Sequence, residues 1–225
     1  MKIYNFSAGP ACMPEAVLQA VRDASIEYEG EGMSVLEMSH RSRPIVELFD
    51  SATSRVRELL DVPSNYHVLW LQGGASLQFS MIPLNLLSEK GCADFLDTGA
   101  WSSKAIIECN RIGIANVIGS SKDSNYTYIP NVYEQDINSE YLHITSNNTI
   151  YGTQYNVLPE VSKGHGPLIA DMSSDILSRP IDIGKFGLIY AGAQKNMGPA
   201  GVTMVIIKND LIGKNYRDIP SMLNY

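Results

Sequence analysis

The chain has 225 residues, of which 44% are hydrophobic and 18% charged, so it can form one large domain or two small ones with a substantial core. Its net charge of −7 is spread along the sequence without a Lys/Arg cluster, which argues against nucleic acid and favours a small-molecule ligand. No stretch approaches the roughly 20 apolar residues that span a bilayer, so a membrane protein is not expected.

The N-terminal residues and the cysteines indicate the compartment. Residues 1–7 lack the charged start, apolar middle and small-residue cleavage site of a secretory signal, so we expect the protein in the cytoplasm. The three cysteines, Cys12, Cys92 and Cys109, are odd in number and have no CxxC spacing. They predict neither a disulfide framework nor a metal site, and we expect buried thiols.

Two helices are predicted in the first 60 residues. Pro14 lies where the first begins, and apolar residues follow at helical spacing through Ala24. Pro44 starts the second, which carries an apolar stripe that ends at Leu60. Residues 30–43 lie between the helices and contain the only close cluster of His and Arg in the chain, at residues 40–43.

Beyond residue 65 the pattern changes to short apolar runs of strand length bounded by glycine or polar residues. The expected strands are residues 66–71, 92–97, 115–118, 141–145, 167–170, 186–191 and 202–207, with helix-compatible segments at 76–87 and 101–110. Several runs are apolar without alternation, which is typical of strands covered on both faces. The alternation of strands and helices predicts an α/β fold with a mainly parallel sheet and helices on both faces. Ligands of such sheets gather at the carboxyl ends of the strands.

Lys195 follows one of these expected strands, in a segment of small residues from Ala191 to Asn196. A lysine held there by a rigid element can form a Schiff base, because partial desolvation favours its neutral, nucleophilic form. For a lone lysine the commoner alternative is a surface residue after a strand.

Asp171 also follows an apolar strand and precedes Ser173 and Ser174. Its carboxylate can pair with a pyridine nitrogen and keep that nitrogen protonated, which makes the ring of pyridoxal phosphate (PLP) an electron sink. The alternative is a helix N-cap, because Asp followed by two serines is also favourable capping chemistry.

Three further segments add candidates for binding a flat, phosphorylated ligand. Gly73 and Gly74 lie between a strand and a helix, where backbone N–H groups can cradle a phosphate, although the segment lacks the P-loop and GxGxxG patterns. Trp101 can stack on a ring, or it is a core residue. The Thr149 hydroxyl can bond a ring oxygen, or it belongs to an ordinary polar turn.

Taken together, these segments resemble the phosphoserine aminotransferase family, in class V of the aspartate aminotransferase-like PLP enzymes. The resemblance covers nearly the whole chain and rests on residues 5–11, 34–41, 71–74, 99–101, 148–150, 171–174, 177–180, 189–196 and 201–203. It implies the large domain of PLP-dependent transferase fold type I, with residues 1–15 as an N-terminal arm and residues 16–225 as the PLP-binding domain. The family's C-terminal small domain has no counterpart in these residues.

The resemblance also implies a role for each candidate. Lys195 corresponds to the lysine that binds PLP covalently, Asp171 to the partner of the pyridine nitrogen, Trp101 to the stacking ring and Thr149 to the group beside the ring oxygen. Ala75 and Ser76 correspond to the backbone phosphate cradle, and Ser173 and Gln194 to side chains that reach the same phosphate. His40 and Arg41 correspond to residues that bind substrate phosphate in a dimeric site; the alternative is a solvated loop.

By this resemblance the protein is a homodimeric transaminase of serine biosynthesis that transfers an amino group between L-glutamate and 3-phosphohydroxypyruvate. Many bacterial members also act in pyridoxine biosynthesis. The chain departs from some relatives at Ser76, where they carry an arginine, and it lacks the arginine expected to bind the substrate carboxylate. Two alternatives stay open: another class V PLP enzyme such as a cysteine desulfurase, and a truncated PLP-binding fragment without turnover.

Overall fold

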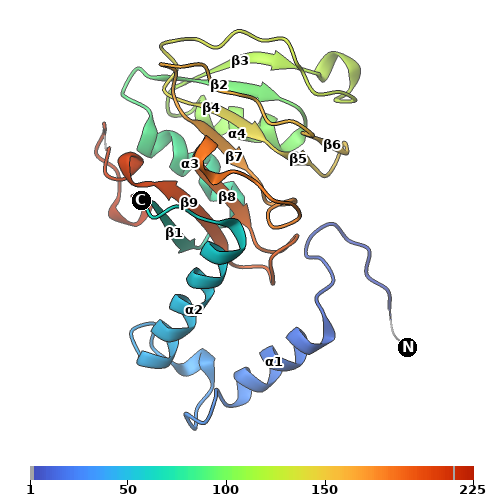
Figure 1. Cartoon of the computed structure of the whole chain (residues 1–225), viewed down its shortest axis with the longest axis vertical. Coiled ribbons are helices and arrows are strands. Elements are labelled where there is room, and N and C mark those ends of the chain that lie inside the picture. Colours follow the sequence, from blue (N-terminus) through green and yellow to red (C-terminus); the bar gives the residue numbers. More distant parts are fainter. Residues whose placement is uncertain (1–2, 215) are drawn as a thin grey trace.

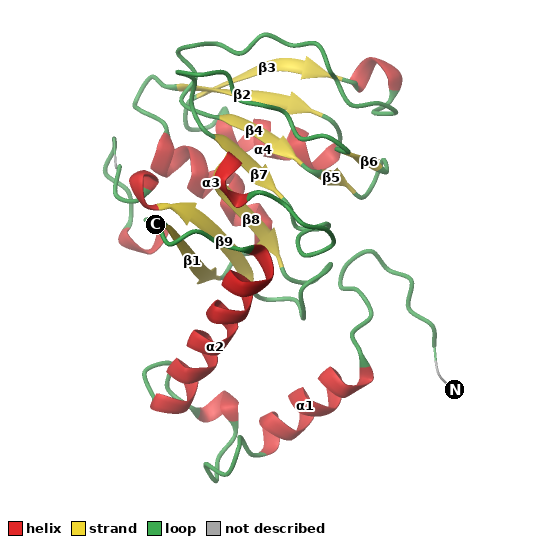
Figure 2. Cartoon of the chain, viewed as in Figure 1, coloured by secondary structure: helices red, strands yellow, loops and turns green. Residues whose placement is uncertain are grey.

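A seven-stranded mixed sheet organises the chain from Tyr66 onward (Figures 1 and 2). The computed structural model describes residues 3–214 and 216–225. The strands follow the order β1-β9-β8-β7-β4-β2-β3, and β9 runs antiparallel to the other six. Their bounds are β1 Tyr66–Leu71, β2 Cys92–Asp97, β3 Ile114–Ser120, β4 Leu142–Thr145, β7 Leu168–Asp171, β8 Phe186–Gly192 and β9 Thr203–Lys208. The seven predicted strands and the mainly parallel sheet are confirmed.

Two helices cover one face of the sheet. They are α3 (Gly74–Leu86) and α4 (Ala100–Cys109), and both begin within two residues of the predicted positions. Phe79 and Ile82 of α3 pack in one buried cluster with Phe95 of β2 and Leu188 of β8. Burial of these side chains stabilises the α3–sheet interface by roughly 1.5–3 kcal/mol for each large apolar residue.

The other face is covered by the end of one helix and by irregular connections. Val56 and Leu60 of α2 (Arg43–Leu60) pack against Ile144, Ile189 and Ile206 of the sheet. The rest of this cover comes from irregular segments, including Tyr133 after β3, Tyr155 after β6 and Ile176 after β7. Shorter elements complete the chain: η1 Val35–Glu37, η2 Lys122–Ser124, β5 Asn147–Asn148, β6 Thr153–Gln154, η3 Ile183–Lys185, η4 Asn209–Leu211 and η5 Ser221–Leu223.

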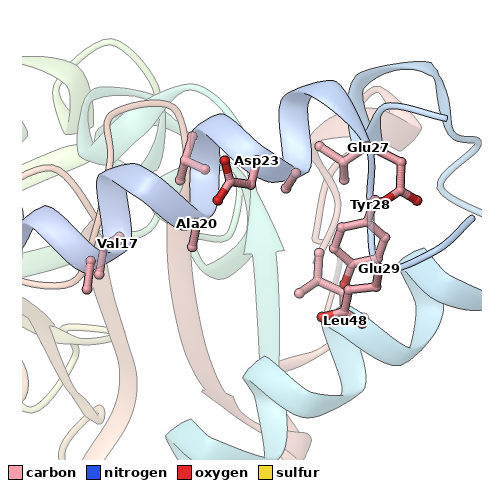
Figure 3. Close-up of a pocket in the computed structure, with 11 residues that line it drawn as sticks. Val17, Ala20, Asp23, Glu27, Tyr28, Glu29 and Leu48 are labelled. Atoms are coloured by element: carbon pink, nitrogen blue, oxygen red, sulfur yellow. The ribbon is translucent and has the colours of Figure 1, made fainter. Parts of the chain in front are cut away.

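The N-terminal quarter lies apart from this core. The first predicted helix, α1 (Glu15–Ile26), has no buried residue. The apolar stripe of α2 is only partly buried, because Leu48 is 43% exposed and Leu59 69% exposed. A groove lined by residues of α1, α2 and the segment between them separates the helices, with Leu48 beside Tyr28 (Figure 3).

The three cysteines differ in burial. Cys109 is buried and Cys92 half-buried, but the expectation of a buried thiol is wrong for Cys12. Cys12 belongs to the extended segment before α1, over which no described element packs closely enough to bury the thiol. Among the described residues, no helix is both long and apolar enough to cross a membrane.

Candidate active site

The predicted site residues follow strands whose carboxyl ends share one edge of the sheet. Strands β2, β4, β7 and β8 are mutually parallel, and β1 runs in the same direction because β1 and β8 are both antiparallel to β9. Residues after these strands therefore converge at this edge. They are Ala75 and Ser76 after β1, Trp101 after β2, Thr149 after β4, Asp171 and Ser173 at the end of β7, and Gln194 and Lys195 after β8.

Lys195 is half-buried between Trp101 and Thr149. Its Nζ donates a hydrogen bond to Thr149 Oγ1 at 3.0 Å and lies 4.8 Å from the centroid of the Trp101 ring. Trp101 Nε1 donates to the same hydroxyl at 3.1 Å. Burial lowers the pKa of Lys195, and the negative charge of Asp171 opposes that shift. Lys195 is thus no isolated surface lysine, and its neutral form is favoured relative to a free lysine.

Asp171 is the last residue of β7 and is buried. Its Oδ1 accepts hydrogen bonds from Ser173 N at 2.9 Å and from Ser173 Oγ at 2.7 Å. Burial raises the pKa of Asp171, while the Ser173 bonds and the Lys195 charge oppose the shift. The capping alternative is right about the local bond to Ser173 N, but in the described chain no helix begins here. A buried carboxylate at this edge suits a cationic partner.

Asn148 holds two of these segments together, and the sequence interpretation gave it no role. It is fully buried, its Oδ1 accepts a hydrogen bond from Trp101 N at 3.3 Å, and its Nδ2 donates to Thr98 Oγ1 at 2.8 Å. Thr149 is its neighbour in the turn between β5 and β6. The polar turn that was the alternative for Thr149 exists, and it brings the Thr149 hydroxyl to Lys195.

The turn before α3 provides backbone donors at the same edge. Gly73 and Gly74 have φ angles of +86° and +67°, and a Cβ on Gly73 would lie 2.4 Å from Leu77 Cδ2, so this turn requires glycine. The N–H groups of Ala75 and Ser76 in the first turn of α3 donate no hydrogen bond within the described residues. Free donors at a helix N-terminus fit an anionic group.

The side chains of the other two predicted phosphate ligands, Ser173 and Gln194, both lie beside Gly192. The Ser173 hydroxyl, besides its bond to Asp171, accepts a hydrogen bond from Gly192 N at 3.0 Å. The Gln194 side chain folds back beside Gly192, because a Cβ at residue 192 would lie 2.7 Å from Gln194 Oε1. Both residues are at the predicted edge, with their polar atoms near the strand end.

His40 and Arg41 are not brought to this cluster within one chain. Both are exposed, in the connection between η1 and α2. Figure 1 shows that α2 approaches the sheet with its C-terminal end, so the connection that holds His40 and Arg41 lies at the far end of the helix. A single subunit therefore leaves the solvated-loop alternative open.

Comparison with known proteins agrees with this α/β fold. The aminotransferase class-V family model matches residues 3–217, and the chain belongs to this family. Its relatives include phosphoserine aminotransferases from Halalkalibacterium halodurans, 51% identical over 226 residues, and from Pseudomonas entomophila, 52% identical over 226 residues. Each comparison covers the whole of this chain, which spans 62% of the length of these curated relatives.

Solved structures give the same result. Phosphoserine aminotransferase from Bacillus circulans subsp. alkalophilus is 48% identical with a TM-score of 0.93, and the match covers 100% of this chain and 62% of that one. A PLP-bound phosphoserine aminotransferase from Trichomonas vaginalis is 39% identical with a TM-score of 0.89, covering 99% of this chain and 66% of that one. The predicted fold type I large domain is therefore confirmed.

Proposed function

We propose that this chain is the PLP-binding part of a phosphoserine aminotransferase, which transfers an amino group between L-glutamate and 3-phosphohydroxypyruvate in serine biosynthesis. The observation that carries the proposal is the half-buried Lys195 amine, held by Thr149 beside the Trp101 ring and near the buried carboxylate of Asp171. The similarity to phosphoserine aminotransferases over the whole chain supports the choice of substrates.

The residues at the sheet edge fit PLP. In this proposal Lys195 binds the cofactor covalently, Asp171 pairs with the pyridine nitrogen, Trp101 stacks on the ring and Thr149 contacts the ring oxygen. The donors of Ala75 and Ser76, with the side chains of Ser173 and Gln194, bind its phosphate. Bound there, PLP supplies an electron sink for the amino-transfer reaction.

The protein's own contribution is to hold charges and move a proton. Burial lowers the pKa of Lys195, so its Nζ can condense with an aldehyde, with loss of one water, and can later accept a substrate proton. The Thr149 hydroxyl holds Nζ at 3.0 Å, which fixes the position from which the proton is taken. Burial raises the pKa of Asp171, and the Ser173 bonds and the Lys195 charge act against that shift and favour the carboxylate.

We further propose that two chains form a homodimer in the cytoplasm and that His40 and Arg41 bind substrate phosphate at the partner's site. Their exposure, far along α2 from their own Lys195, supports a role across a subunit interface. A guanidinium fork suits phosphate because it forms paired charge-assisted hydrogen bonds.

A second candidate is a PLP-binding chain without turnover. A visible spectrum with glutamate distinguishes the two. Loss of the long-wavelength absorbance of bound PLP on adding glutamate supports transamination, and an unchanged spectrum supports binding alone. Phosphoserine formation should then be compared between residues 1–225 and the same chain extended by a relative's C-terminal domain, where we expect much faster turnover. An extended chain without phosphoserine formation contradicts the proposed function.

A further inference from the structure

The extended N-terminal segment reaches the lysine of the candidate site. In Figure 1 this dark blue segment bends toward the loop that follows β8. The contact is close, because a Cβ built on Gly9 would lie 2.8 Å from Lys195 Cγ and 3.5 Å from Gln194 Cγ. Real Cβ atoms essentially never come within 3.0 Å of another heavy atom. Residue 9 therefore has no room for a side chain while Lys195 holds its present position.

A backbone hydrogen bond holds the segment in place. Ala11 N donates to Gln194 O at 2.8 Å, one residue before the lysine. The segment is also shaped internally, since Ser7 N donates to Asn5 Oδ1 at 2.9 Å. The contact with Gly9 is thus made by a segment with a defined path, anchored on the same loop that carries Lys195.

The position of the contact on the lysine side chain decides its consequence. Cγ is only two bonds from Cα, so it cannot yield as the far end of a flexible side chain can. Nζ, at the other end, is held by Thr149 and lies against Trp101. A methyl group at residue 9 must either rotate the whole Lys195 side chain or displace the N-terminal segment from Gln194.

We propose that Gly9 is a positioning residue, whose missing side chain lets Lys195 extend toward Thr149 and Trp101. This deepens the proposed function, on which it rests, by assigning a role to part of the predicted N-terminal arm. Both responses to a side chain at residue 9 move Nζ or expose it to water. Exposure removes the burial that favours the neutral amine.

The test uses the full 225-residue chain and the variant Gly9→Ala, with Gly198→Ala as matched control. Gly198 follows Lys195 by three residues, and a Cβ there meets no atom within 4 Å. Without cofactor, acetylation of Lys195 by acetic anhydride is followed against pH, and hydrogen exchange of the Ala11 amide is measured. With cofactor, the rate of covalent attachment of PLP is measured from the visible spectrum.

Gly9→Ala should shift the acetylation profile of Lys195 to higher pH. If the segment leaves Gln194, exchange of the Ala11 amide should also become faster. PLP attachment should slow about tenfold or more, since misplacement of a reacting group by about 1 Å costs on the order of a hundredfold in rate. Gly198→Ala should match wild type. If Gly9→Ala behaves like Gly198→Ala in both the acetylation profile and the attachment rate, the inference is wrong.

Two further outcomes are separable. If Gly9→Ala does not fold, Ala11→Pro decides by the same acetylation profile, because it removes the donor to Gln194 O without placing a methyl group near Lys195. An unshifted profile in Ala11→Pro then contradicts the inference. If wild type does not attach PLP at Lys195, the proposed function is wrong. The acetylation profile and the Ala11 amide exchange, both measured without cofactor, still test the role of Gly9.

Discussion

The sheet edge and the α1–α2 region differ in what their side chains contact. At the edge, Asp171 is 4% exposed and bonds to Ser173 in the turn that follows β7. Asn148 is fully buried and bonds to Trp101, which is distant in the sequence. In the α1–α2 region, α1 buries no residue, and an apolar groove lies open beside it (Figure 3). The residues proposed to bind PLP therefore contact one another within one chain, whereas the N-terminal helices present apolar surface of the kind that interfaces use.

The largest effect on the amino-transfer rate should come from removing the charge of Asp171 at the sheet edge. Asp171→Asn keeps the size of the side chain but removes the negative charge expected to hold the pyridine nitrogen protonated. In the chain extended by a relative's C-terminal domain, Asp171→Asn should lower the amino-transfer rate on the order of a hundredfold or more. The loss of PLP occupancy should be much smaller. Single-turnover kinetics with glutamate measure the first quantity and the visible spectrum the second. Near-normal turnover would give the electron-sink role to another residue.

A matched pair of leucines tests the difference in packing. Leu188 of β8 is fully buried and Leu18 of α1 is 48% exposed. Leu188→Ala should lower the free energy of unfolding by about 2–5 kcal/mol, because it leaves a cavity in the core. Leu18→Ala should change it by about 0.5 kcal/mol or less. Urea denaturation measures both, and equal losses would show that α1 is covered in solution.

Arg41→Ala should weaken binding of the phosphorylated substrate without changing binding of PLP. Because Arg41 is exposed and far along α2 from Lys195, Arg41→Ala should leave PLP binding unchanged. In the extended chain it should raise the KM for 3-phosphohydroxypyruvate by about tenfold, corresponding to one charge-assisted hydrogen bond of roughly 1.5 kcal/mol, and leave the KM for glutamate nearly unchanged. Steady-state kinetics check this. Equal effects on both KM values would indicate a structural role for the loop.

The smallest effect concerns the pH dependence of stability. Burial lowers the pKa of Lys195, so between that lowered pKa and the ordinary value of 10.5 the folded chain binds fewer protons than the unfolded chain, and stability rises with pH. Lys195→Met should therefore raise the Tm of the cofactor-free chain at pH 7, and the gain should shrink as the pH approaches 10.5. Lys104→Met is the control, since Lys104 is exposed and its Nζ lies 4.5 Å from the same Trp101 ring centroid. A gain in Tm that does not depend on pH would argue against the lowered pKa of Lys195.

The sheet could be predicted from the sequence because each strand is a short apolar run with turn residues at its ends. Each apolar run between turn residues became a strand, and the residues placed after strand ends, such as Lys195 and Asp171, do lie at one edge. Helical spacing was equally clear in α1, but spacing reveals that a face is apolar and not what covers it. The contact of Gly9 with Lys195 joins residues far apart in the chain, and no local pattern encodes such a contact.

Lys195 is the residue proposed to bind PLP covalently. The most direct test is borohydride reduction of the PLP-treated 225-residue chain, followed by peptide mapping. We expect one reduced adduct, on Lys195, and its disappearance in Lys195→Ala while some PLP still binds without a covalent bond. An adduct mapped to another lysine, or one that persists in Lys195→Ala, would show that Lys195 does not hold PLP.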